Sequence, residues 1–247
     1  MQQYYANGHL IPLSTVPAFC LQLPAGETID SVQHFVYVLD CISLLFKQHI
    51  PQIGNKELTI VCDPYESNPI CYRASHLIIL STNPSNWCQI AYQFAHELCH
   101  YAIPADVDSS LRWLEESICE TASLYFMYRL TLLWNDRNEQ LRTTAGSLYA
   151  PEFTRYAIDS MKQFKEFDLK DATAISELES NCYDRLKNRY VANHLLSIFI
   201  EYPQTWEAVP LLCQIRQSSL GEAIDAWLCQ ASPSAQQGLQ RIRDLMI

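Results

Sequence analysis

Hydrophobic residues recur at spacings of three and four over two consecutive stretches in the middle of the chain. The first stripe comprises Trp87, Ile90, Phe94, Leu98 and Tyr101. The second comprises Leu111, Leu114, Ile118, Ala122 and Tyr125. This period is typical of amphipathic helices that bury one face. Asn83-Pro84 suits the N-cap and first turn of the first helix, and Pro104 ends it.

The residues before these stripes predict one helix and two strands. Apolar positions with the helical period indicate a helix from Thr28 to about His49. Two short runs rich in isoleucine, leucine and valine lie within Glu57–Asp63 and Ala74–Ser81. They indicate strands that a proline-bounded turn separates.

From about residue 146 onward, nearly the whole chain has a helical pattern. The predicted helices span 151–166, 172–184, 186–201, 205–217, 219–230 and 234–246. We therefore expect an α+β fold that is predominantly helical. Residues 1–145 would carry the sheet and the two central helices, and residues 146–247 would form a helical subdomain that closes a cleft.

Composition narrows the class of protein. The net charge of −10 on 247 residues argues against nucleic acid or an anionic membrane surface as a main partner. Apolar runs such as Leu195–Ile200 are too short to span a bilayer. The N-terminus lacks the features of a secretory signal, and none of the ten cysteines forms a C-x-x-C pair. These features predict a cytoplasmic protein with reduced thiols.

The first predicted helix carries the sequence His96-Glu97-Leu98-Cys99-His100. Residues four apart share a helix face, so both imidazoles can bind one zinc ion. Glu97 stands beside them and can act as the general base toward a zinc-activated water. The helical repeat turns Cys99 away from this face, and we interpret it as a packing residue.

Catalytic zinc needs three protein ligands and one open position, and the second predicted helix supplies candidates for the third ligand. Glu116 and Glu120 are four residues apart and share a face. One carboxylate can bind the metal while the other accepts the ring N–H of a ligand histidine. Glu115 points elsewhere on the helix and is expected to be solvated.

The HExxH motif, followed by a Trp-Leu-x-Glu context at Glu116 and a further acid at Glu120, resembles the gluzincins. These are the thermolysin-like and aminopeptidase-type metallopeptidases, and the match is to their small members. The resemblance implies one Zn²⁺ per chain bound by His96, His100 and Glu116, with Glu97 as general base and Glu120 supporting the first histidine. Because the stretch between His100 and Glu116 is shorter than in the large gluzincins, the reverse assignment, with Glu120 as ligand, stays open.

The resemblance also implies a zincin-like small sheet beside the active-site helix, with an edge strand that lines the cleft. The strand around His76–Leu80 is the expected edge. The segment from Arg189 to Tyr202 resembles a C-terminal helix of small gluzincins, in which a tyrosine reaches the oxyanion. Tyr190 is the matching position, and a role as a packing aromatic is the alternative. His194, one turn further, is a weaker candidate with a structural alternative.

These expectations describe a zinc metallopeptidase that acts on a peptide or protein substrate. The chain has no Gly-x-Met-Glu-Asn segment, the element that recognises the substrate amino terminus in the aminopeptidases it resembles. Endopeptidase action or a narrow protein substrate is therefore favoured. Two alternatives remain open: a catalytically silent or triggered zincin scaffold that serves as a regulatory or protein-binding module, and a hydrolase of some other amide.

Overall fold

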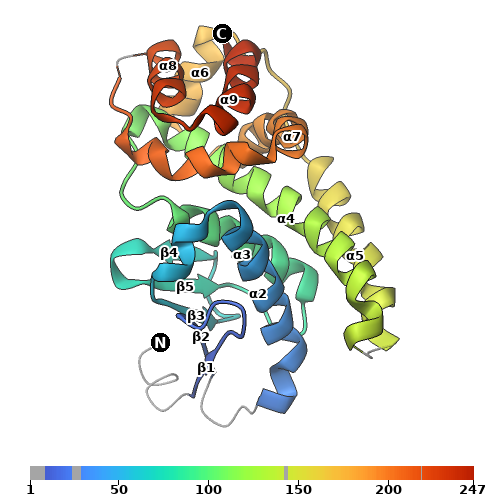
Figure 1. Ribbon diagram of the computed structural model, residues 1–247. Coiled ribbons are helices and arrows are strands. Elements are labelled where there is room, and N and C mark those ends of the chain that lie inside the picture. The colour runs from blue at the N-terminus through green and yellow to red at the C-terminus, as the bar shows by residue number, and fades with distance from the viewer. Residues whose placement is uncertain (1–8, 24–28, 142–143, 218) are drawn as a thin grey trace. The chain divides into compact units, whose positions relative to one another are not determined.

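The computed structural model describes residues 9–23, 29–141, 144–217 and 219–247 (Figure 1). The fold is α+β and mostly helical, as predicted. The strands are β1 (Leu10–Pro12), β2 (Phe19–Gln22), β3 (Leu58–Cys62), β4 (Ile70–Tyr72) and β5 (Leu77–Leu80). The α-helices are α2 (Ile29–His49), α3 (Trp87–Ala102), α4 (Arg112–Leu141), α5 (Thr144–Met161), α6 (Ala172–Ser180), α7 (Arg185–Glu201), α8 (Leu220–Gln230) and α9 (Pro233–Met246). Short 3-10 helices are η1 (Pro51–Asn55), η2 (Arg73–Ser75), η3 (Ser109–Leu111) and η4 (Pro203–Gln214).

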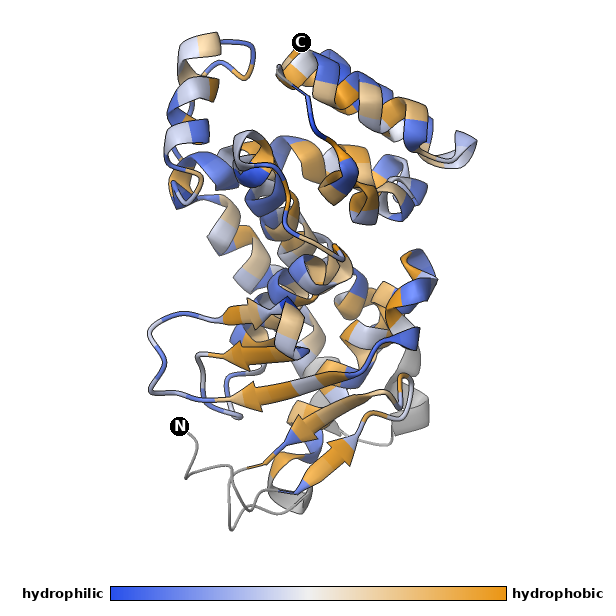
Figure 2. Cartoon of the chain, turned by 90° about the vertical axis from the view of Figure 1, so that its left-hand side faces the viewer, coloured by the Kyte–Doolittle hydropathy of each residue, from blue (hydrophilic) through white to orange (hydrophobic). Residues whose placement is uncertain are grey.

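The five strands form one mixed sheet in the order β1-β2-β3-β5-β4. The central pairs β2–β3 and β3–β5 are parallel, and the outer pairs β1–β2 and β4–β5 are antiparallel. Helix α2 is the crossover between the parallel strands β2 and β3. The central strands are almost wholly hydrophobic (Figure 2), as is typical of strands with both faces covered.

The predicted edge strand is wrong. Strand β5 lies inside the sheet, because Ile78 pairs with Ile60 of β3 on one side and with Cys71 of β4 on the other. The edges of the sheet are β1 and β4, and β4, next to β5, falls in a segment expected to be a turn or its flank. Its three residues show no buried stripe, since Ile70 and Tyr72 are both exposed, and hydrophobic patterning therefore gives no signal for it.

Helix α3 forms with the expected buried face but begins later than expected. Ile90, Phe94 and Leu98 are fully buried. Asn83 begins a turn closed by the hydrogen bond from Asn86 N–H to its carbonyl (3.0 Å), and the helix follows with Ile90 N–H donating to the Asn86 carbonyl. The proline after Asn83 thus lies in a turn, three residues before the first helical residue, and Asn83 is not the N-cap.

The chain divides into two compact units. One comprises Met1–Tyr101 and Phe126–Ala157, and the other Ala102–Tyr125 and Ile158–Ile247. In the first, Trp87 stacks on His34 (centroids 4.8 Å apart) and lies 4.1 Å from the ring of Tyr149. In the second, Trp206 is fully buried and its ring centroid lies 4.2 Å from that of Phe199.

No helix within the described ranges is long and apolar enough to cross a membrane.

Candidate metal centre

Helix α3 presents the two motif histidines side by side. The ring centroids of His96 and His100 are 5.0 Å apart, as expected for residues one turn apart on the same face. Both side chains are half-buried, whereas Glu97 is buried with 5% of its surface exposed. Cys99 is fully buried, which confirms that it packs in the core.

The end of α3 is tied to the sheet through Arg73, the first residue after the edge strand β4. Arg73 Nε donates to the His100 carbonyl (2.8 Å), one of the last carbonyls of the helix. A cation at this position also interacts favourably with the C-terminal end of the helix dipole. Arg73 Nη2 lies 3.4 Å from His100 Nδ1. The edge strand and the second motif histidine are thus held together.

A second link joins Tyr101 to the residues that flank β3 and β5. Burial raises the pKa of Tyr101 to about 12, so its hydroxyl keeps its proton and donates to the Glu57 carbonyl. The same oxygen lies 2.7 Å from His76 Nδ1 and can accept a hydrogen bond from the Nδ1–H tautomer. His76 precedes β5 in a left-handed conformation (φ 49°) and is exposed. These contacts assign His76 a local structural role.

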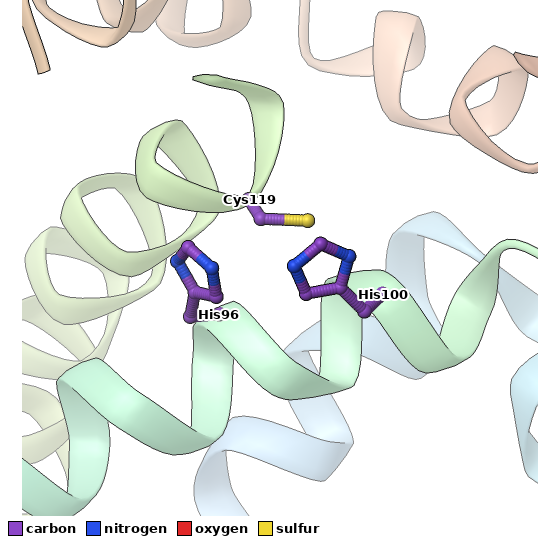
Figure 3. Close-up of side chains that lie close together, drawn as sticks. All are labelled: His96, His100 and Cys119. Carbon is purple, nitrogen blue, oxygen red and sulfur yellow. The ribbon is translucent and has the colours of Figure 1, made fainter. Parts of the chain in front are cut away.

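Cys119 of α4 is a candidate metal ligand that the sequence did not lead us to expect. The candidate ligand atoms of His96, His100 and Cys119 lie within 4.8 Å of one another (Figure 3). A signal for it existed, because Cys119 follows Glu116 by three residues and so shares its face of the helix. Two imidazoles with a thiolate or a carboxylate form a donor set that suits zinc.

The three glutamates near the start of α4, Glu115, Glu116 and Glu120, differ in environment. Glu116 is half-buried. Glu120 is buried and accepts a hydrogen bond from Arg189 Nε (2.7 Å). Glu115, expected in solvent, is only 6% exposed, so that expectation is wrong. Its neighbours Trp113 and Leu114 are fully buried, and few residues in this stretch of α4 are exposed. A helix that is covered on most of its surface also buries polar residues outside its apolar stripe.

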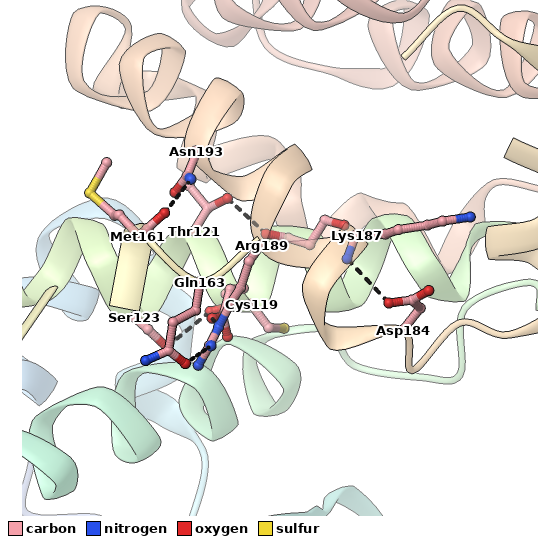
Figure 4. A network of polar contacts seen from close by, with 11 residues as sticks. Cys119, Thr121, Ser123, Met161, Gln163, Asp184, Lys187, Arg189 and Asn193 are labelled. Atoms are coloured by element: carbon pink, nitrogen blue, oxygen red, sulfur yellow. Dashed lines mark hydrogen bonds and ion pairs between the residues drawn. The ribbon is translucent and has the colours of Figure 1, made fainter. Parts of the chain in front are cut away.

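Arg189 links α4 to α7 through a network of polar contacts (Figure 4). Besides Glu120, it donates from Nη1 to Gln163 Oε1 (2.9 Å). Asn193, one turn further along α7, donates to the Met161 carbonyl (2.9 Å). The buried ion pair thereby fixes the part of α4 that carries the candidate third ligands.

Tyr190 follows Arg189 on α7 and is half-buried among aromatic rings. Its ring centroid lies 4.7 Å from that of His194, 5.3 Å from Phe167 and 5.6 Å from Phe164. His194 itself is exposed. This packing supports the structural alternative for both residues.

Comparisons of the chain with models of protein families, with curated proteins and with solved structures find no match.

Proposed function

We propose that this protein is a zinc-dependent metallopeptidase. The observation that carries the proposal is the arrangement on α3: His96 and His100 are side by side and half-buried, and the Glu97 carboxylate belongs to the same helical turn. A structural zinc site has no need of a general base next to its ligands. The placement of Glu97 therefore favours chemistry over a purely structural metal.

The proposed ligands are His96, His100 and Glu116, with the fourth position open. Zinc, when bound, supplies a Lewis acid that polarises the scissile carbonyl and acidifies water. Glu97 takes the proton of the attacking water and returns it to the departing amine nitrogen. Tyr190 is the proposed donor to the developing oxyanion.

Glu120 is the less suitable ligand, because its carboxylate already neutralises the buried guanidinium of Arg189. Binding zinc through Glu120 would divide one carboxylate between the metal and the guanidinium and weaken a buried ion pair, which is costly. This ion pair supports Glu116 as the proposed third ligand.

The proposed substrate is a peptide in extended conformation that adds to the outer edge of β4. Main-chain hydrogen bonds to an exposed edge give affinity without demanding a particular sequence. Support comes from Arg73, which follows β4 directly and binds the carbonyl of His100. A peptide on this edge would therefore lie beside the end of the metal-binding helix. This is consistent with an endopeptidase.

One observation favours the second candidate, a catalytically silent scaffold. If Cys119 and Glu116 both bound the metal together with the two histidines, the site would have four protein ligands and no open position, as in structural zinc sites. The protein would then act as a regulatory or protein-binding module.

Elemental mass spectrometry on purified variants tests the ligand assignment. We expect one zinc per chain in the wild type, loss of zinc in Glu116→Ala and retention in Cys119→Ala. Loss of zinc in Cys119→Ala, together with retention of zinc in Glu116→Ala, would make Cys119 the third ligand in place of Glu116. Loss in both variants would favour the closed, silent site, and no zinc in the wild type after reconstitution would overturn the proposal.

Glu97→Gln tests the reaction itself. The variant should bind zinc as the wild type does, because residue 97 is not a ligand, and should lose at least about 100-fold in turnover because no group then moves the proton. Cleavage of a peptide library, followed by mass spectrometry, measures this loss. Cleavage at the wild-type rate would contradict the assigned mechanism.

A further inference from the structure

Gln93 extends the polar face of α3 beyond the metal-binding motif. It precedes His96 by three residues and Glu97 by four, so all three side chains lie on adjoining turns of one face. Only 8% of the Gln93 surface is exposed. The residue is therefore a buried amide in line with the proposed general base.

One end of this amide is held and the other is not. Gln93 Nε2 donates to Ser81 Oγ (3.0 Å), and Ser81 directly follows β5. Gln93 Oε1 is also buried, and no hydrogen-bond partner for it exists within the described ranges of the chain. If the amide were reversed, Oε1 would accept from the Ser81 hydroxyl, and the buried NH₂ group would then be the end without a partner.

The other glutamine of α3, Gln89, shows that the fold can provide a hydrogen-bond donor for a glutamine oxygen. Gln89 is one turn earlier, and its Oε1 accepts a hydrogen bond from Thr82 Oγ1 (3.0 Å). Native proteins leave few buried acceptors without a donor, and an apolar side chain of similar size would fill the space of Gln93 at no such cost. The unused oxygen therefore indicates a donor that the described part of the chain does not supply.

We propose that Gln93 is a substrate-binding residue whose Oε1 accepts a hydrogen bond from a backbone N–H of the extended peptide. The inference rests on the proposed function and names one group that positions the substrate. Three and four residues of helix separate Gln93 from His96 and Glu97, which corresponds to about 4.5 and 6 Å along the axis. Two residues of an extended chain span about 6.6 Å. A peptide whose scissile bond lies at Glu97 thus brings an N–H to Gln93 within two residues of that bond.

The side chain can reach this donor without a change in the backbone. The terminal torsion of glutamine is broad, so rotation about it turns Oε1 toward the polar face and moves Nε2 away from Ser81 Oγ, while the preceding carbons stay packed. The hydrogen bond that Oε1 gains from the substrate replaces the one that Nε2 gives up to Ser81.

The test is a coupling measurement between protein and ligand. The probes are tripeptide hydroxamates, which chelate zinc through one end, and analogues in which each backbone N–H is replaced in turn by an ester oxygen. The proteins are zinc-loaded wild type, Gln93→Met and, as a matched control on the same helix, Gln89→Met. Inhibition constants are compared across the full set.

We expect one ester replacement to weaken binding to wild type and Gln89→Met about tenfold, and to have little effect on Gln93→Met, whose zinc content is unchanged. Equal weakening in all three proteins would overturn the inference while leaving the metallopeptidase intact. If no hydroxamate binds zinc-loaded wild type, the proposed function fails, and the inference fails with it. Gln93→Asn, which keeps the amide but shortens its reach, provides the same comparison if Gln93→Met does not fold.

Discussion

At the scale of single residues, the acidic side chains of α4 are distinguished by their partners rather than by their order in the sequence. Glu120 and Arg189 form an ion pair in which the side chains are 5% and 10% exposed. Removing two charges from water is expensive, and the pair is stable only because each group compensates the other. The consequence is that neither residue can be replaced alone without leaving a buried charge.

Arg189→Met is therefore expected to lower the free energy of unfolding by about 3–5 kcal/mol, because Glu120 is left buried without its counter-charge. The double variant Glu120→Leu/Arg189→Met should recover most of this loss. Urea unfolding followed by circular dichroism measures both. Arg243→Met is the control: it breaks the exposed pair with Asp225 and should change stability little. A loss in the double variant as large as in the single one would contradict the pairing.

At the scale of elements, α9 packs closely against η4 at Gly238, which has no side chain. A Cβ built on Gly238 of α9 would lie 1.8 Å from Thr205 Oγ1 and 3.0 Å from Tyr202 Cβ. Thr205 is fully buried and its hydroxyl donates to the Tyr202 carbonyl (2.6 Å), so it cannot rotate away freely. The glycine is required by the close approach of the two elements.

Gly238→Ala is expected to destabilise the protein by about 1–3 kcal/mol despite the higher helix propensity of alanine, because the added methyl group overpacks the interface. Gly221→Ala offers a matched control on α8. Its added Cβ would meet only Ile247 Cδ1, at 3.9 Å, and it should leave stability unchanged or raise it by up to about 1 kcal/mol. Thermal unfolding of both variants measures the difference. If the two substitutions had the same effect, the close packing of α9 on η4 would be wrong.

At the scale of the whole molecule, the ten cysteines range from buried to exposed, and none forms a disulfide. Five are buried: Cys41, Cys62, Cys99, Cys119 and Cys213. Cys229 is exposed. Burial raises the pKa of Cys62 to about 12, and burial followed by the charge of Glu152 raises that of Cys88 to about 11. Because only the thiolate reacts with alkylating agents, these shifts suppress reactivity near neutral pH.

Alkylation of the native protein with iodoacetamide should therefore label Cys229 first and the five buried cysteines last. At pH 8 only about one Cys88 in a thousand is ionised, and its labelling should rise about tenfold per pH unit until the pH approaches 11. Peptide mass spectrometry at several pH values measures each rate, and denatured protein, in which all ten should react alike, is the control. Labelling of Cys88 as fast as that of Cys229 at pH 8 would contradict its burial.

The sequence by itself determined the two central helices and the local geometry of the motif. Spacings of three and four predicted α3 and α4 with the correct buried faces, because helical period is a local property that neighbouring residues fix. The same period placed His96 and His100 side by side and Cys99 in the core. None of these features depends on which distant segment packs nearby.

The tertiary structure alone decided which residues meet across long sequence separations. Strand pairing placed β5 between β3 and β4 and made β4 one of the two edges of the sheet. The partner of Glu120 is Arg189, 69 residues later, and the burial of Glu115 depends on packing beyond its own helix. Such pairings leave no periodic trace in the sequence, because they depend on how elements pack, and packing is a property of the folded chain.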